Sequence, residues 1–365
     1  MSWKSGHGGN LWALLEESDL SADQVLDFSA DLNPMGPPPN FKELLEAGCE
    51  SVRWYPDPDY LEFREAAAGA LGIDPANVLP GNGTADLIHL ISRLYARSQA
   101  VVVAPTFTEY ERAVAADGGH PMPWLLKEEN GFAPPDLNES FPLEGSRLLF
   151  VCNPNNPTGT LWSRERLVAL LELCRNAGIT VVVDEAYLDL IEDAAGASAV
   201  SFIHRFPQLI VLRSLTKSFA VPGLRAGYLV AAEPMVGRLK SVQPPWSMNA
   251  LSAALATGWI QRPEILAEAR QALKEFRSTL WEGLKRIPGL RPFPSKANFF
   301  LCRITDPAWT NDRLAECLRR KGILIRICDD FTGLAPGRFI RLAVRRPEEN
   351  ERLLNVLKDC LGHAG

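Results

Sequence analysis

A lysine and an arginine stand eight residues apart in the segment "SLTKSFAVPGLRAGY" (214–228), directly after the apolar run "LIVLRS". A lysine at the end of a buried strand is partly desolvated, which favours its uncharged amine and makes Lys217 a candidate nucleophile toward carbonyl groups. Arg225 follows in a glycine-flanked turn, a suitable place for a phosphate-binding guanidinium. A single lysine of this kind is more often without chemical function, so its role depends on the other strand ends.

Asp184 ends the apolar run "TVVV" and opens the segment "DEAY" (184–187). Burying an ionised carboxylate is costly unless water or a cation reaches it. The position therefore predicts one of two environments for Asp184: a protonated nitrogen of a ligand, or a structural ion pair.

Two more strand ends carry polar turns. In "GNGTADLIHLI" (81–91), glycines precede a helix that begins near Thr84, and the free N–H groups of such a helix suit a phosphate. A dinucleotide fingerprint is disfavoured, because Asp86 stands at the third glycine position. In "NPNNPTGT" (153–160), asparagine amides lie between prolines. Both segments are also compatible with ordinary turns.

The elements that must position these groups follow one pattern. Short β-branched runs are predicted to be strands buried on both faces, at residues 100–106, 147–153, 180–187, 209–215 and 226–231. Amphipathic helical segments lie between several of these runs. The alternation predicts an α/β fold with a mostly parallel sheet, in which ligands gather at the carboxyl ends of the strands.

The pattern changes after two prolines at 244 and 245. Longer helices are predicted there, then strand-like pieces and a last helix from about Pro347, which together indicate a smaller α+β domain. We predict an N-terminal arm and part of the small domain at 1–45, a large cofactor-binding domain at 46–245 and a small C-terminal domain at 246–365.

Composition excludes several classes of function. The chain has 365 residues, of which 46% are hydrophobic and 22% charged, as expected for a globular enzyme. Its formal charge of -6 is dispersed, and no basic run predicts nucleic-acid binding. No signal peptide or membrane span is predicted, so a cytoplasmic location without membrane contact is expected.

Cysteines, histidines and serines narrow the chemistry further. The seven cysteines are odd in number and form no Cys-x-x-Cys pair, so reduced, buried thiols are expected. The five histidines show no ligand spacing, which predicts no metal site. A serine-hydrolase interpretation of "HGGN" (7–10) fails, because the chain has no Gly-x-Ser-x-Gly elbow.

One cofactor needs all of the groups at these strand ends. Pyridoxal 5'-phosphate requires a lysine for its aldehyde, a carboxylate for its ring nitrogen, an amide and a phenol for its ring hydroxyl, and a helix N-terminus with an arginine for its phosphate. The sequence therefore predicts pyridoxal 5'-phosphate as the cofactor. In this interpretation Lys217 holds the aldehyde, while Ser214 and Arg225 hold the phosphate.

The segments "NPNNPTG", "DEAY" and "SLTKSFAVPGLRAGY" resemble, in order and separation, those of the fold type I pyridoxal-phosphate enzymes, the aspartate aminotransferase superfamily. The resemblance implies a large domain with a mostly parallel seven-stranded sheet and a smaller α+β domain. It implies that Lys217, Asp184 and Tyr187 are the catalytic residues, with Asn156 beside Tyr187 at the ring hydroxyl. The other cofactor-binding residues so implied are Gly83, Thr84, Ala85, Phe107, Ser214 and Arg225.

Within the superfamily the chain is similar to two branches, the histidinol-phosphate aminotransferases and the threonine-phosphate decarboxylases. Both use a "YPD" segment, here 55–57, whose tyrosine comes from the partner subunit, so a homodimer is implied. "HGGN" and "PPWSMNALS" (244–252) are more characteristic of the decarboxylases. This branch implies that Arg341 binds the substrate carboxylate and that Asn156 also contacts the substrate. The residues that it implies around the substrate phosphate are His7, Asn33, Tyr55 and Arg326.

The chain departs from the decarboxylase pattern at Asp31, where that branch usually has asparagine. A carboxylate close to an anionic substrate would repel it, so the sequence does not determine which residues contact the substrate phosphate. The expected function is decarboxylation of L-threonine O-3-phosphate in cobalamin biosynthesis, with histidinol-phosphate transamination as the alternative. A non-catalytic effector-binding module would have lost the lysine or the aspartate, and both are present.

Overall fold

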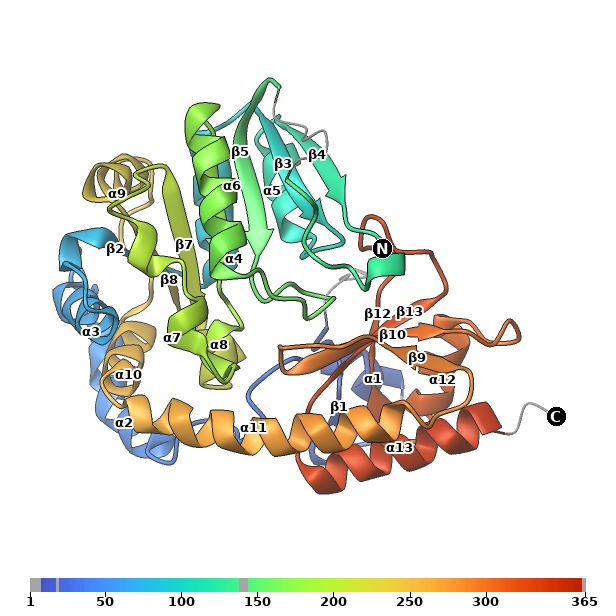
Figure 1. The fold of residues 1–365 in the computed structure, drawn as a ribbon. Helices are drawn as coiled ribbons and strands as arrows, with labels where there is room; N and C mark the ends of the chain where they lie inside the picture. Colours follow the sequence, from blue (N-terminus) through green and yellow to red (C-terminus); the bar gives the residue numbers. More distant parts are fainter. Residues whose placement is uncertain (1–7, 18–19, 138–143, 363–365) are drawn as a thin grey trace.

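The computed structural model describes residues 8–17, 20–137 and 144–362 (Figure 1). Within them, one seven-stranded sheet is mostly parallel, and only β8 runs antiparallel to its neighbours. In spatial order its strands are β2 (Val78–Gly81), β8 (Gly227–Ala231), β7 (Leu209–Ser214), β6 (Thr180–Asp184), β5 (Ser146–Cys152), β3 (Gln99–Ala104) and β4 (His120–Leu125). The predicted mostly parallel, seven-stranded sheet is confirmed.

Both faces of this sheet are covered by helices. Along β3, Val101 and Val103 belong to one apolar cluster, and Ala100 and Val102 belong to the cluster on the opposite face. Side chains alternate across a strand, so a run without polar positions requires burial on both sides. In Figure 1, α6 (Arg164–Asn176) covers one face, and α4 (Thr84–Leu94) with α5 (Glu109–Ala116) covers the other.

Local sequence signals explain where α6 begins and which side it buries. Ser163 precedes the helix, and its hydroxyl accepts a hydrogen bond from the Arg166 N–H, as N-cap serines do. Leu167, Leu170 and Leu171 lie at helical spacing and are fully buried against the sheet.

The C-terminal part of the chain builds a second, antiparallel sheet. Its strands, in order, are β12 (Arg326–Ile327), β13 (Phe339–Ala343), β10 (Phe299–Ile304) and β9 (Leu290–Pro292). A separate parallel pair joins β1 (Leu26–Asp27) to β11 (Ile323–Leu324). The predicted strand at 323–328 is thus divided between two sheets at Ile325.

The remaining helices complete both parts of the molecule. The long helices α11 and α13 run side by side beneath the small domain (Figure 1). The full set of remaining α-helices is α1 (Leu11–Glu17), α2 (Phe41–Gly48), α3 (Leu61–Leu71), α7 (Ala194–Ala197), α8 (Leu215–Ser218), α9 (Glu233–Lys240), α10 (Ala250–Ile260), α11 (Pro263–Leu284), α12 (Asn311–Arg319) and α13 (Pro347–Gly362).

The proposed domain boundaries remain a prediction, and the packing of α10 bears on one of them. Leu255, Ala256 and Trp259 of α10 are buried in the cluster that also contains strands of the central sheet. The same helix packs against α2 and α3. Although α10 follows residue 245, its apolar contacts are therefore with the larger part of the molecule.

The expectation of seven reduced thiols is wrong for one pair. Cys317 on α12 and Cys360 on α13 form a disulfide across 43 residues of sequence. Packing of these two helices brings the cysteines together, and no sequence spacing signals it. The free cysteines are Cys49, which is exposed, and four that are buried, Cys152, Cys174, Cys302 and Cys328.

Within the described ranges of the chain, no helix is both long and apolar enough to cross a membrane. In those same ranges, no group of three or more histidine, cysteine, aspartate or glutamate side chains is arranged to hold a metal ion.

Candidate active site

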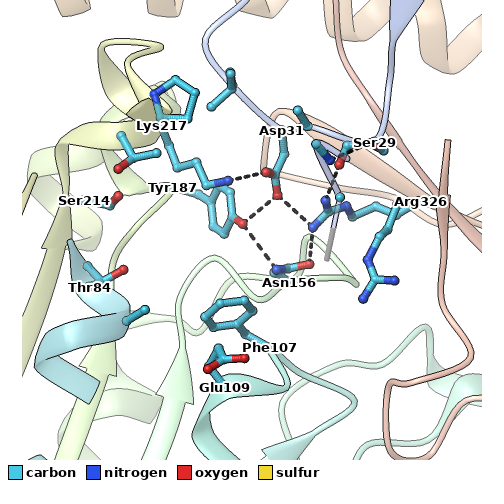
Figure 2. A pocket seen from close by; sticks show the side chains of 18 of the residues that line it. Ser29, Asp31, Thr84, Phe107, Glu109, Asn156, Tyr187, Ser214, Lys217 and Arg326 are labelled. Atoms are coloured by element: carbon cyan, nitrogen blue, oxygen red, sulfur yellow. Dashed lines mark hydrogen bonds and ion pairs between the residues drawn. The ribbon is translucent and has the colours of Figure 1, made fainter. Parts of the chain in front are cut away.

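A cavity of about 720 Å³ lies where the carboxyl ends of the central strands face the small domain. Its lining comes from chain segments far apart in sequence: residues 8–12, 27–32, 84–85 and 107–112, single residues after β5 and β6, and residues 214–225 and 326–341. Figure 2 shows side chains from these segments pointing into the same space. The predicted gathering of polar residues at the strand ends is thus observed.

Lys217 lies in the cavity on the short helix α8, which directly follows β7. Its Nζ is 2.5 Å from Oδ1 of Asp31 and 5.7 Å from the centroid of the Tyr187 ring. The lysine amine is therefore held within the cavity by side chains from two other segments.

A cradle for a phosphate lies at the start of α4. Thr84 and Ala85 form the first turn of this helix, and both line the cavity together with Ser214 and Arg225. Gly83 precedes the helix with φ of +82°, and a Cβ there would lie 2.9 Å from the Arg225 guanidinium. Only glycine allows this turn to approach Arg225 so closely without strain. Free N–H groups, hydroxyls and a guanidinium together suit a phosphate.

Asp184 lies at the end of β6 and is 3% exposed. Burial raises the pKa of its carboxyl to about 6, although hydrogen bonds from Tyr110 and from the Ala186 N–H, at 2.7 and 2.9 Å, and the charge of Lys217 act in the opposite direction. A protonated ring nitrogen beside this carboxylate would supply the positive charge that burial demands.

Asn156 and Tyr187 form the polar wall of the cavity. The Asn156 amide donates to the Tyr187 hydroxyl at 3.2 Å. The neighbouring asparagines, Asn153 and Asn155, instead accept hydrogen bonds from the Trp162 N–H and the Thr106 hydroxyl and act as structural residues. Of the three asparagines in "NPNNPTGT", only Asn156 lines the cavity among the described residues.

Phe107 also lines the cavity, and its ring contacts Tyr110 edge-on. An aromatic face at this place can stack on a flat ligand ring. Figure 2 shows Phe107 on the wall opposite Lys217.

Two arginines from neighbouring strands of the small domain reach the same cavity. Arg341 on β13 donates to Asn156 Oδ1 at 2.6 Å and to the Ser29 carbonyl at 2.9 Å. Arg326 on β12 forms an ion pair with Asp330, with Nη2 2.8 and 2.7 Å from the two carboxylate oxygens. Both guanidinium groups are buried or nearly so and could meet anionic groups of a substrate.

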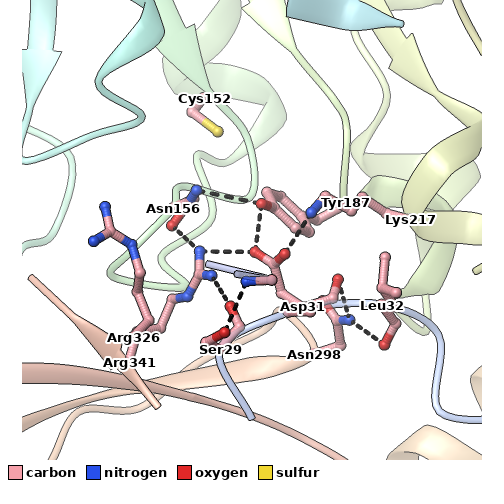
Figure 3. A network of polar contacts seen from close by, with 12 residues as sticks. Ser29, Asp31, Leu32, Cys152, Asn156, Tyr187, Lys217, Asn298, Arg326 and Arg341 are labelled. Atoms are coloured by element: carbon pink, nitrogen blue, oxygen red, sulfur yellow. Dashed lines mark hydrogen bonds and ion pairs between the residues drawn. The ribbon is translucent and has the colours of Figure 1, made fainter. Parts of the chain in front are cut away.

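The structure shows which groups surround Asp31, a point that the sequence did not determine. Its carboxylate lies between Lys217, Arg341 and the Tyr187 hydroxyl, which donates to it at 2.6 Å (Figure 3). Arg326, the arginine expected at the substrate phosphate, is paired with Asp330 instead. Asp31 is thus a partner of the lysine and of the arginine expected at the substrate carboxylate.

Two of the predicted substrate residues, Asn33 and Tyr55, do not line the cavity of their own chain, and a third is not described. His7 lies outside the described residues. The Asn33 side chain donates to the Ser218 carbonyl at 2.9 Å and accepts from the Met35 N–H at 3.1 Å, so it ties its segment to the lysine loop. Tyr55 is 78% exposed and stacks on Trp246, with ring centroids 4.4 Å apart.

Sequence reasoning missed several residues of the site. Glu109 and Arg112 line the cavity and form an ion pair of 2.6 Å, and Thr216 lies beside Lys217. Tyr110, which holds Asp184, stands three residues after Phe107, and the order "PTFTEY" is the only local signal for it.

The structure explains why the second and third positions of "HGGN" are glycines. A Cβ on Gly8 would collide with the Ser29 carbonyl, and the Gly9 N–H donates to the Ser29 hydroxyl at 2.8 Å. Glycine lets this segment pass close to Ser29, and Gly8, Gly9, Leu11 and Trp12 all line the cavity.

These residues fit pyridoxal 5'-phosphate. A lysine amine, a phosphate cradle into which a Gly83 Cβ would intrude and an aromatic wall are arranged around one cavity. The buried carboxylate of Asp184 is not among the described residues that line this cavity, but it interacts with the charge of Lys217 from the end of β6. The fold and this site define the class of fold type I pyridoxal-phosphate-dependent enzymes.

Comparison with known proteins identifies the family. The chain matches aminotransferase class I and II over residues 23–357 and belongs to that family. It is 34% identical over 360 residues to a threonine-phosphate decarboxylase from Salmonella typhimurium, covering 98% of this chain and 97% of the relative. It is also 34% identical over 324 residues to a histidinol-phosphate aminotransferase from Thermoanaerobacter sp., covering 88% of each.

A solved structure supports the same fold. The histidinol-phosphate aminotransferase from Sinorhizobium meliloti, in complex with pyridoxal-5'-phosphate, superposes with a TM-score of 0.79 at 24% identity, covering 92% of this chain and 90% of that one. The family match and the relative that covers nearly the whole chain show that the chain is a pyridoxal-phosphate-dependent enzyme, as the sequence predicted.

Proposed function

We propose that this enzyme decarboxylates L-threonine O-3-phosphate to (R)-1-amino-2-propanol O-2-phosphate in cobalamin biosynthesis. The observation that carries the proposal is the pair of arginines, Arg326 and Arg341, which face one cavity together with Lys217. Two guanidinium groups beside an amine-reactive lysine suit a substrate that has an amine, a carboxylate and a phosphate. The similarity to a threonine-phosphate decarboxylase over nearly the whole of both chains supports the same substrate.

The residues of the site have separate tasks in this reaction. When bound, pyridoxal 5'-phosphate supplies an electron sink for the electrons released as a bond to the substrate Cα breaks. Asp184 keeps the proton on the ring nitrogen, and Asn156 with Tyr187 binds the ring hydroxyl. Arg341 binds the substrate carboxylate, and Arg326 binds the substrate phosphate after exchanging its contact with Asp330. Lys217 Nζ accepts or returns the proton at Cα.

The arginines determine which bond breaks. The bond that stands perpendicular to the cofactor ring is the one whose electrons the ring accepts. Arg341 and Arg326 hold the two ends of the substrate and so set its rotation about Cα. If they hold the carboxylate perpendicular to the ring, carbon dioxide leaves.

The first experiment is to mix cofactor-loaded enzyme with L-threonine O-3-phosphate, without any keto acid, and to measure carbon dioxide and the amine product. Continuous release over many turnovers is expected, and Lys217→Ala should abolish it because the reacting amine is lost. The absence of release by the wild-type enzyme contradicts the proposed reaction. Undiminished turnover by Lys217→Ala contradicts the assignment of the lysine.

Histidinol-phosphate transamination is the second candidate function. A histidinol-phosphate aminotransferase is 34% identical to this chain over the region compared, the same value as for the threonine-phosphate decarboxylase. It would require the bond from Cα to hydrogen to stand perpendicular to the ring, with Lys217 moving that proton. Glutamate formation from histidinol phosphate and 2-oxoglutarate, without carbon dioxide release from threonine phosphate, would support this alternative.

We also propose that the enzyme acts as a cytoplasmic homodimer in which Tyr55 reaches the site of the partner subunit. Exposed apolar side chains gather around the segment that carries Tyr55 and usually mark a contact surface on a soluble protein. They are Val52, Trp54, Leu61 and Trp246, with exposed fractions between 43% and 72%. Tyr55 itself is not among the described residues that line the cavity of its own chain.

A further inference from the structure

Asp31 is a buried carboxylate with two cationic partners. It is 2% exposed, with Oδ1 2.5 Å from Lys217 Nζ and Oδ2 2.7 Å from an Arg341 guanidinium nitrogen. The Tyr187 hydroxyl donates to Oδ2 at 2.6 Å. A carboxylate with two cations and a hydroxyl donor is strongly favoured in its ionised form.

The backbone on both sides of Asp31 is fixed. The Asn298 amide donates to the carbonyls of Asp31 and Leu32 at 3.0 Å each (Figure 3). The Asn33 N–H donates to the Lys217 carbonyl at 3.0 Å. These contacts tie the segment of Asp31 to the small domain and to the lysine loop, so the carboxylate has little freedom to move away from Lys217.

The charge state of Asp31 follows from this environment. Burial alone would raise the pKa of its carboxyl, but Arg341 and Lys217 outweigh burial and hold that pKa well below its ordinary value. Asp31 is therefore an anion over the whole pH range in which an enzyme of this kind works.

We propose that Asp31 is a positioning residue that holds a proton on the Lys217 nitrogen in the cofactor-loaded enzyme and keeps that nitrogen directed toward Arg341. The nitrogen that carries the cofactor is the same atom that lies against Asp31 Oδ1. A fixed anion at hydrogen-bond distance is the natural acceptor for its proton and stabilises the protonated form. The inference concerns the cofactor and not the substrate, so it stands or fails independently of the proposed decarboxylation.

Asp184, Tyr187 and Arg341 also lie near Lys217 or interact with its charge. Asp184, at the end of β6, is the second anion that interacts with the lysine charge. Tyr187 presents its ring to Nζ, and Arg341, on β13, lies on the far side of Asp31. Removing Asp31 would leave the positive charge of Arg341 without its carboxylate partner. That positive charge would disfavour a proton on the lysine nitrogen.

The test is a pH titration of the visible absorbance of the cofactor-loaded enzyme without substrate, because that absorbance changes with protonation of the nitrogen that carries the cofactor. Asp31→Asn keeps the shape of the side chain and removes its charge. We expect the midpoint to fall by about one to three pH units, the usual effect of an opposite charge in contact. Asp330→Asn is the matched control, since it removes the carboxylate partner of Arg326 without touching Lys217, and its midpoint should be unchanged.

A second variant keeps the inference testable if Asp31→Asn does not fold. Arg341→Met removes the cation on the other side of Asp31, so the midpoint should move upward, opposite in sign to Asp31→Asn. An unchanged midpoint in Asp31→Asn, or in Arg341→Met where only that variant folds, would overturn the inference. An equal shift in Asp330→Asn would also overturn it, because a general change in cavity charge would then explain the result.

Discussion

At the scale of single residues, burial and direct ion pairing shift the pKa of a carboxyl group in opposite directions. Asp184 has hydrogen-bond donors but no ion pair within 4 Å among the described residues, whereas Asp31 has two cationic partners. The pKa of Asp184 therefore rises to about 6, while that of Asp31 falls well below its ordinary value. Two buried carboxylates around one lysine thus have opposite shifts, because only one is directly paired.

This difference predicts how Asp184 affects stability. In the folded cofactor-free enzyme Asp184 binds its proton more tightly than in the unfolded chain. Its favourable contribution is present below pH ~4 and is lost as the pH rises through about 6. Asp184→Asn removes this dependence, so its free energy of unfolding relative to wild type should increase by up to ~3 kcal/mol between pH 4 and pH 7.

The measurement is urea unfolding of both cofactor-free proteins at several pH values. Taking the difference between them cancels the titration of other groups. Asp312→Asn, at an exposed position on α12, is the control for the loss of one carboxyl group at the surface. A pH dependence of the difference for Asp184→Asn that is no larger than that for Asp312→Asn would show that Asp184 does not titrate in this range.

At the scale of elements, the site depends on where strands end and helices begin. Asp184 ends β6 and Ser214 ends β7. Lys217 follows β7 on α8, and Thr84 begins α4. The ends of adjacent parallel strands lie at one edge of the sheet, and a helix that begins there directs its free N–H groups toward the same space. The turn at Gly83 sets how closely α4 approaches Arg225.

Gly83→Ala tests this turn. Both Gly83 and Gly72 have positive φ. Alanine should cost about 1 kcal/mol of stability at Gly72, whose φ of +68° and ψ of +38° are left-handed helical. It should cost ~1–3 kcal/mol at Gly83, whose φ of +82° and ψ of +168° lie in a region that only glycine adopts readily. Only at Gly83 would the new Cβ lie 2.9 Å from Arg225; at Gly72, the C-cap of α3, it would meet nothing within 4 Å. We expect Gly83→Ala to weaken cofactor binding ~10-fold or more, and Gly72→Ala to leave it unchanged.

The Kd for pyridoxal 5'-phosphate is obtained by titrating each cofactor-free variant and following the change in absorbance. An affinity unchanged from wild type in both variants would show that the close approach to Arg225 does not matter for binding of the phosphate. An equal loss in both variants would instead attribute the effect to general destabilisation.

At the scale of the whole molecule, the cavity is assembled from both ends of the chain. Residues 8–12 and 27–32 line it together with the central strand ends and with Arg326 and Arg341 of the small domain. If the enzyme is a homodimer as proposed, Tyr55 adds a group from a second chain. Each site then needs one chain for Lys217 and the other for Tyr55.

Subunit mixing tests the contribution of Tyr55. Lys217→Ala and Tyr55→Ala should each have little activity. A mixed dimer has one site with both substitutions and one site with neither, so mixing the two variants should restore activity that neither shows alone. Mixing Lys217→Ala with Asp184→Asn is the control, because both residues serve the same chain's site and no intact site can form.

Decarboxylation is measured after dissociation and reassociation of the mixed variants. Recovery in the Tyr55 mixture but not in the control is the expected result. The absence of recovery, with mixed dimers demonstrated by differential tagging, would place Tyr55 in the site of its own chain or outside any site.

The sequence by itself determined the parts of this protein that depend on short-range patterns. Runs without polar positions predicted the doubly covered strands, and polar residues directly after them predicted where Lys217, Asp184 and Asn156 lie. These inferences succeed because the side-chain period and the common edge of parallel strand ends are local properties of the chain. The chemical groups at the strand ends predicted the cofactor, and the resemblance of three short motifs added the enzyme superfamily.

Only the tertiary structure decided contacts between distant segments. Asp31 meets Lys217 across 186 residues and Tyr187 across 156, and Cys317 meets Cys360 across 43. Asn33, expected in the cavity, turns instead toward the Ser218 carbonyl. Such pairings depend on how all the intervening elements pack, and no spacing in the sequence records that geometry. The charge around the lysine, and with it the chemistry of the site, is therefore a property of the folded chain.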